Sequence, residues 1–223
     1  VLTVARVIKN KDENRKGVLE RVDSKSVFMK KVLAEQELVR NENVEKICEI
    51  FRNNEIKRTY NGTAIDIDSY YNKVYRELKK IEPSSMDIQE FVQNLEKFQD
   101  YKDFELMAGL FLSALINSST DRIIHIDLRH LRYPLDFVGY ENKKEVYIIG
   151  DVGNFLGYFM SKGRITLIGN VGIEVGKKMN GGEIYISKEV IYISREIWKA
   201  KIYRYDTMDL DIGRDNLEAL IKK

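Results

Sequence analysis

The residues best suited to chemistry lie in one short stretch that also contains both histidines of the chain. Apolar and polar residues alternate there, so in a β-strand His125, Asp127 and Arg129 share one face. A histidine, a carboxylate and a guanidinium on one face can bind an anionic ligand or carry out acid–base chemistry. The alternative interpretation is the solvated face of an ordinary strand. These three residues are the candidate ligand-binding residues of the chain.

Closely spaced glycines invite a nucleotide-binding interpretation, but their spacing does not fit one. Gly150, Gly153 and Gly157 are three and four residues apart, so a G-x-G-x-x-G motif is absent, and a strand rather than a helix follows. The stretch from Gly172 to Lys178 is one residue short of a P-loop and lacks the Ser or Thr that would hold Mg²⁺. We therefore expect structural glycines and no nucleotide cofactor.

Metal ligands and nucleophiles are sparse. One cysteine, Cys48, and two histidines cannot supply a zinc site. Asp206, Asp209 and Asp211 do not have the spacing of a calcium loop. No Ser-His-Asp or Cys-His set can be assigned. The sequence predicts no metal, no cofactor and no catalytic residue, and it favours a protein that is not an enzyme.

Composition narrows the class of protein. The 223 residues are 43% hydrophobic and 32% charged, which is typical of a globular chain long enough to bury a core. A net charge of +2 argues against a nucleic-acid partner. No apolar run approaches 18 residues and the start carries no secretory signal, so we expect a cytoplasmic protein with no membrane contact. The abundance of Lys, Glu and Ile resembles a thermophile composition.

Two kinds of periodicity divide the chain. Up to Asn117 the apolar residues recur with helical spacing, after a short predicted strand at residues 1–8. Helices are predicted from about Ser26 and over 43–53, 66–81, 84–98 and 103–117, the last apolar nearly all round. At Asp121 the period changes to two, which predicts domains at 1–120 and 121–223. A final helix is expected from Asp215 to Lys223.

The second half repeats itself every 19 residues. Identical pairs are Gly150/Gly169, Gly153/Gly172, Gly157/Gly176, Met160/Met179 and Gly163/Gly182. A fixed period of this length indicates a solenoid, whose coils bury their apolar faces only by stacking. We expect Ile165 and Leu167 to stack over Ile184 and Ile186, with a related strand at 145–149.

This repeat resembles the GXGXG domain, a right-handed β-helix that occurs in one of the subunits of formylmethanofuran dehydrogenase and in the glutamate synthase large subunit. The methionine-containing form is closer to the formylmethanofuran dehydrogenase domain. The resemblance covers about residues 122–205, is strongest over 145–187, and does not extend to 1–120. It implies a scaffold inside a larger redox complex, and it carries over no catalytic residue. Family members usually have more copies than the two seen here.

The fold class expected is therefore α+β: an α-helical N-terminal half followed by a short right-handed β-helix and a C-terminal helix. A solenoid end exposes strand edges, so we expect the helix at 103–117 to cover one end and the last helix to cover the other. The function expected is a non-catalytic scaffold or interaction protein with a protein partner or as a homo-oligomer. The alternative is a small-molecule-binding protein or enzyme, with its site between the helical half and the face that carries His125, Asp127 and Arg129.

Overall fold

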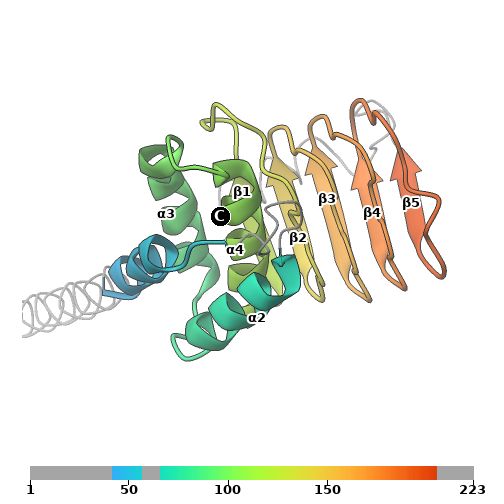
Figure 1. The fold of residues 1–223 in the computed structure, drawn as a ribbon. Coiled ribbons are helices and arrows are strands. Elements are labelled where there is room, and N and C mark those ends of the chain that lie inside the picture. Colours follow the sequence, from blue (N-terminus) through green and yellow to red (C-terminus); the bar gives the residue numbers. More distant parts are fainter. Residues whose placement is uncertain (1–41, 57–65, 205–223) are drawn as a thin grey trace, which may run out of the picture. The chain divides into compact units, whose positions relative to one another are not determined.

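A computed structural model of the protein describes residues 42–56 and 66–204, in which helices are followed by a β-solenoid (Figure 1). This is the α+β fold class that the sequence predicts. The predicted strand at 1–8, the helix from about Ser26 and the final helix from Asp215 to Lys223 lie outside the described residues.

The described helices agree with the helical periodicity of the sequence. In chain order they are residues 42–53, α2 (Ile67–Leu78), α3 (Ser85–Asn94), the 3-10 helix η1 (Leu95–Phe98) and α4 (Phe104–Ser118).

Helix starts are set by local capping residues. The carboxylate of Asp66 accepts the backbone N–H of Ser69 at 3.0 Å, at the start of α2. Ser84 and Asp87 form a reciprocal capping box at the start of α3. Asp103 occupies the N-cap position of α4 but has left-handed backbone geometry, with φ of 56°, and its side chain makes no capping hydrogen bond. Asp66 and Ser84 therefore cap α2 and α3 through their side chains, whereas Asp103 does not cap α4 in this way.

An aromatic cluster joins the helices. Phe51, from the helix at 42–53, lies with its ring centroid 5.8 Å from that of Phe91, 5.1 Å from that of Phe98 and 5.0 Å from that of Phe111. All four rings are buried. Because these residues come from the 42–53 helix, α3, η1 and α4, their predicted apolar stripes meet in one core.

α4 joins the helices to the solenoid. A Cβ atom on Gly109 would lie 1.7 Å from the carbonyl oxygen of Asp136, so the helix approaches the backbone of the first coil directly. One turn further, the hydroxyl of Ser113 donates to the carbonyl of Phe137 at 2.8 Å and accepts the N–H of Tyr140 at 3.1 Å. α3 packs beside β1, the first strand of the sheet. The helices thus cover the β1 end of the solenoid, as expected for the helix at 103–117.

One parallel sheet runs along the solenoid. Its strands are β1 (Ile123–Asp127), β2 (Glu145–Ile149), β3 (Arg164–Ile168), β4 (Glu183–Ile186) and β5 (Lys201–Arg204), paired in that order (Figure 1). The pairing of β2 with β3 and of β3 with β4 is offset by 19 residues, which is the sequence period. The first coil is longer, since Ile124 pairs with Val146, and the last is shorter, since Ile184 pairs with Ile202.

The solenoid core consists of columns of apolar side chains. Ile165 stacks on Ile184 and Leu167 on Ile186, and all four are fully buried, which confirms the predicted inward face. Further columns are Leu135, Val152 and Val171 on the second side of each coil, and Met160 with Met179. Each coil therefore completes the core of its neighbour.

Left-handed backbone positions recur with the 19-residue period, and one corner illustrates them. Gly157 and Gly176 have φ of 70° and 68°, and a Cβ on Gly157 would lie 2.6 Å from the Cδ1 of Ile184 in the core column. These glycines thus serve both backbone geometry and close packing. Two residues earlier, Phe155 and Glu174 also have positive φ, so the left-handed geometry belongs to the corner and not to glycine alone.

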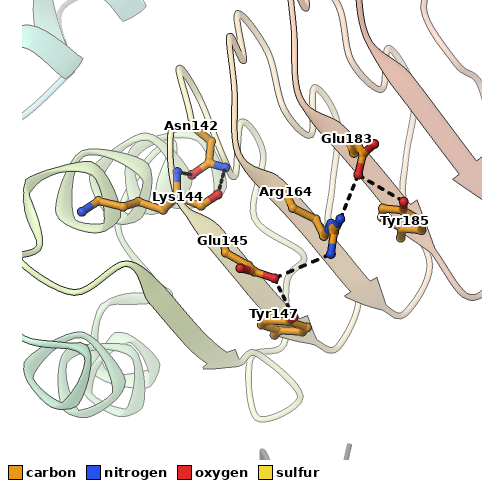
Figure 2. A network of polar contacts seen from close by, with 7 residues as sticks. All are labelled: Asn142, Lys144, Glu145, Tyr147, Arg164, Glu183 and Tyr185. Carbon is orange, nitrogen blue, oxygen red and sulfur yellow. Dashed lines mark hydrogen bonds and ion pairs between the residues drawn. The ribbon is translucent and has the colours of Figure 1, made fainter. Parts of the chain in front are cut away.

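A short polar turn connects the first coil to β2. The buried side chain of Asn142 donates to the carbonyl of Lys144 at 2.9 Å and accepts its N–H at 3.2 Å (Figure 2). The Lys144 ammonium donates to the carbonyls of Ser119 and Asp121, at 2.8 and 2.9 Å. This lysine therefore ties the turn to the linker between α4 and β1.

The described residues from Asn43 to Arg204 belong to one compact unit. Its buried residues form one cluster that runs from the helices into the solenoid. The division into domains at 1–120 and 121–223 stays a prediction. In the part of the chain that the structure describes, no helix has the length and hydrophobicity needed to cross a bilayer.

Candidate functional site

We call the outward side of the sheet the outer face, and two of its parallel rows of side chains form connected networks. The charged row contains Glu145, Arg164, Glu183 and Lys201, one from each of β2 to β5. The ring row contains His125, Tyr147, Thr166, Tyr185 and Tyr203, one from each of β1 to β5. Because side chains of a strand alternate in direction, both rows lie opposite the core columns.

Charges alternate in sign across the charged row, and Arg164 joins its neighbours. One guanidinium nitrogen, Nη2, lies 3.0 Å from a carboxylate oxygen of Glu183, and the other, Nη1, lies 3.8 Å from Glu145 (Figure 2). The same carboxylates accept the phenol groups of Tyr147, at 2.9 Å, and Tyr185, at 3.2 Å. The network therefore spans three strands and connects the two rows.

The ring row is stacked at both ends. His125 and Tyr147 have ring centroids 5.0 Å apart and planes 12° apart, and Tyr185 and Tyr203 have centroids 4.7 Å apart and planes 20° apart. In the middle, the guanidinium carbon of Arg164 lies 5.3 Å from the centroid of Tyr185. Cation–π contact thus continues the row across β3, whose own residue is the small Thr166.

Ionisation of the outer face follows from these contacts. The hydrogen bond from Arg164, followed by that from Tyr185, lowers the pKa of Glu183. Burial, followed by the hydrogen bond to Glu145, raises the pKa of Tyr147, and burial likewise raises that of Tyr185. At neutral pH the row therefore carries fixed charges on Arg164 and Glu183 beside neutral phenols.

Of the three candidate ligand-binding residues, Asp127 and Arg129 pair with each other, and His125 has a different partner. His125 and Asp127 lie on the outward side of β1, half-buried, whereas Arg129 follows the end of the strand and is exposed. The Arg129 guanidinium donates to both carboxylate oxygens of Asp127, at 2.9 and 2.5 Å. That hydrogen bond lowers the pKa of Asp127. Within the described residues neither partner contacts the ring of His125, which stacks on Tyr147 instead.

The two histidines have different environments. Burial lowers the pKa of His125, and the nearby carboxylate of Glu145 opposes this shift. The other, His130, has its Nε2 3.0 Å from the carbonyl oxygen of Val92 on α3. His130 therefore fixes the loop after β1 against the helices.

Other reactive groups give no second site among the described residues. Cys48 is buried in the helical core, and burial raises the pKa of its thiol. Within residues 42–56 and 66–204, no three His, Cys, Asp or Glu side chains lie together so as to hold a metal ion. Asp206, Asp209 and Asp211 lie outside the described residues.

A cavity of about 460 Å³ lies at the corner that follows β1, and we call it the corner groove. Arg129, Arg132 and Lys188 line it together with Ile149, Gly150, Asp151 and Ile168, among other residues. Of the three candidate residues, only Arg129 lines this groove. The cavity therefore lies at the corner after β1, and neither His125 nor Asp127, which the small-molecule-binding alternative also names, lines it.

The charged row was missed by the sequence reasoning, although a signal was present. Glu145, Arg164 and Glu183 occupy one position of the 19-residue repeat, so their alternation is visible once charges as well as glycines are aligned. The stack of His125 on Tyr147 has no such signal, because the first coil departs from the repeat length.

A scan against protein-family models, a search of curated proteins and a search of solved structures find no significant match to this chain. The resemblance to GXGXG domains therefore stays a prediction that rests on the repeat residues.

Proposed function

We propose that the protein is a non-catalytic scaffold or interaction protein whose outer face docks a folded protein partner. The observation that carries this proposal is the charged row, ordered by Arg164, beside a row of stacked rings. Aromatic residues and arginine are the types enriched at the energetic centres of protein interfaces. Here they lie on a sheet whose strands are held in register by the solenoid core.

The size of the outer face limits the kind of complex. Strands about 4.8 Å apart and residues about 3.3 Å apart give a flat surface of roughly 19 by 16 Å, or about 300 Å². A stable interface buries about 800 Å² on each partner. The outer face would therefore be the centre of a larger contact that includes neighbouring corners of the solenoid.

The charges of the outer face favour a folded protein as the occupant. The charged row has two carboxylates and two cations, and Asp127 is neutralised by Arg129. A balanced face has no long-range attraction for the phosphates of nucleic acids or of membrane lipids. A protein surface that also mixes charges with apolar groups is complementary to it.

The state of the candidate reactive groups also favours a scaffold over an enzyme. Asp127 is ion-paired with Arg129 and the ring of His125 is stacked on Tyr147, so the two are not arranged as an acid–base pair. The likeness of the repeat to GXGXG domains leads to a narrower proposal, in which the partner belongs to a redox enzyme.

The test is affinity capture from extracts of the source cells with three matched baits. These are the wild-type chain, Arg164→Glu, and Lys73→Glu, which makes the same charge change on an exposed residue of α2. Circular dichroism checks that each bait is folded. We expect one stoichiometric partner whose retention falls at least about tenfold with Arg164→Glu and is unchanged with Lys73→Glu.

A redox partner would be recognised by the absorbance of a bound flavin or iron–sulfur cluster. The scaffold proposal is abandoned if the wild-type and Arg164→Glu baits retain the same proteins equally. It is equally abandoned if the isolated chain turns over a substrate and loses that activity on His125→Ala.

A further inference from the structure

The corner groove is lined by both cationic and apolar side chains. Arg129, Arg132 and Lys188 are the cations that line it, against one carboxylate, Asp151. Leu128, Leu131, Pro134, Ile149 and Ile168 supply apolar lining atoms. A volume of about 460 Å³ lies within the range of small-molecule sites, which combine apolar lining with a small number of polar groups that orient the ligand.

Two of the cations are available to a ligand. Arg132 has one ion-pair contact, at 3.9 Å to Asp100, and both side chains are more than half exposed, so this pair is weak. Lys188 is exposed and makes no ion pair with the residues that the structure describes. Asp151, in contrast, already accepts the N–H and the side-chain amide of Asn170, at 2.8 and 3.0 Å. Because Arg129 is paired with Asp127, the two remaining cations, Arg132 and Lys188, outnumber the one carboxylate, and the net charge of the groove is positive.

The wall that carries Arg129 and Arg132 is fixed before any ligand binds. Besides the contact of His130 with α3, the N–H of Arg132 donates to the side-chain oxygen of Gln99 at 2.6 Å, and the N–H of Leu131 donates to Leu128 at 3.0 Å. The Arg132 guanidinium also lies 5.3 Å from the ring centroid of Tyr133. Order of this kind lowers the entropic cost of binding.

Lys188, another cation of the groove, stands at a repeat position that glycine occupies in the preceding coils. Lys188 occupies the position of Gly150 and Gly169 in the two preceding coils, and its charge lies beside the groove that Gly150 lines. A Cβ on Gly150 would lie 2.9 Å from the backbone nitrogen of Arg129, so the end of β2 approaches the loop closely. Cations from the corner after β1 and from the corner after β4 thus line one cavity that runs across the intervening coils.

From these observations we propose that the corner groove binds a small organic anion, a carboxylate or phosphate ester with an apolar body. The acidic group pairs with a cation of the groove, Arg132 in the loop after β1 or Lys188 in the corner after β4, and the apolar body lies over Ile149 and Ile168 between them. This inference does not depend on the charged row, on the ring row or on the scaffold proposal. The proposed small-molecule site lies at the corner that follows β1, and not on the strand face that carries His125.

The test is a ¹H–¹⁵N NMR titration of the full chain with phenyl phosphate, benzoate, inorganic phosphate and neutral benzyl alcohol. We expect phenyl phosphate and benzoate to shift the amides of Arg129, Gly150 and Lys188 together. Inorganic phosphate, without an apolar body, and benzyl alcohol, without a charge, should each bind at least about tenfold more weakly.

The matched variants are Arg132→Gln with Lys188→Gln, and Lys162→Gln as the control, all at exposed positions. The double variant should weaken phenyl phosphate binding about tenfold, and the control should leave it unchanged. Lys188→Gln alone gives a second test, because its side chain has no described partner to leave unpaired. Shifts that are absent, that spread over the surface and include Lys162, or that are equal for inorganic phosphate would overturn the proposal. Unchanged affinity in the double variant would do the same.

Discussion

The imidazole ring of His125 lies stacked on the phenol ring of Tyr147, 5.0 Å away and one coil further along the chain. The stack covers one face of the imidazole, so protonation there costs desolvation. We predict that His125 titrates below its ordinary pKa of 6.5 and that Tyr147→Ala raises this pKa toward 6.5. An NMR titration of the His125 ring protons measures both values, and an unchanged pKa in Tyr147→Ala would disprove the role of the stack.

The same shift predicts a pH dependence of stability. Because the folded pKa is depressed, the unfolded chain binds more protons as pH falls below 6.5. The contribution of His125 is therefore fully present above pH 6.5 and is lost as pH falls through the folded pKa. Urea unfolding of the wild type and of His125→Gln at a series of pH values should show a smaller loss in the variant below pH 6.5. Parallel curves would contradict this.

Arg164 gives a test of the charged row. Lysine keeps the charge but has one nitrogen, so Arg164→Lys cannot contact Glu145 and Glu183 as the two guanidinium nitrogens do. We expect Arg164→Lys to lower the free energy of unfolding by about 0.2–1 kcal/mol, the range of exposed ion pairs. A double-mutant cycle with Glu183→Gln, in low and high salt, isolates the pair. A coupling energy of zero in low salt would show that the network is not a stabilising one.

For Gly109→Ala, the sign of the change in the free energy of unfolding distinguishes two effects. Helix propensity alone makes Gly→Ala in a helix stabilising by about 1 kcal/mol. The approach of α4 to the backbone oxygen of Asp136 predicts the opposite, a net loss of at least about 1 kcal/mol from overpacking. Urea unfolding of Gly109→Ala decides between the two, and a more stable variant would rule out the close contact of α4 with the first coil.

Lys144 and its neighbour Lys143 form a matched pair for the linker after α4. Lys144→Met leaves the carbonyls of Ser119 and Asp121 without their charged donor, which we expect to cost about 1–3 kcal/mol. Lys143 is exposed, so Lys143→Met should change stability by less than about 0.5 kcal/mol. Thermal unfolding of both variants gives the comparison. Equal losses of stability would argue that the hydrogen bonds from Lys144 to the linker do not stabilise the fold.

Sequence periodicity predicts the coils that follow the 19-residue repeat, and it does not predict the coils whose length differs from it. Gly157 and Gly176, with Met160 and Met179, mark the 19-residue coil, and the stacked interior follows from it. The lengths of the first and last coils carry no glycine signal, so the partners of β1 and β5 were not predictable.

The candidate sites show the same limit. His125 and Asp127 were placed correctly on one strand face by their alternation. Their contacts depend on which strand lies next to β1 and on how the chain turns after Asp127, and neither is a local property of the sequence. The corner groove combines Arg132 with Lys188, which are far apart in the chain and meet only through stacking.

The alternation of the charged row also restricts how the solenoid can evolve in length. Glu145, Arg164, Glu183 and Lys201 change sign at each strand, so the electrostatic repeat is two coils although the structural repeat is one. Deletion or tandem duplication of one coil would place like charges on adjacent strands, whereas a gain of two would preserve the order. Insertions that keep this order of charges should therefore contain an even number of coils.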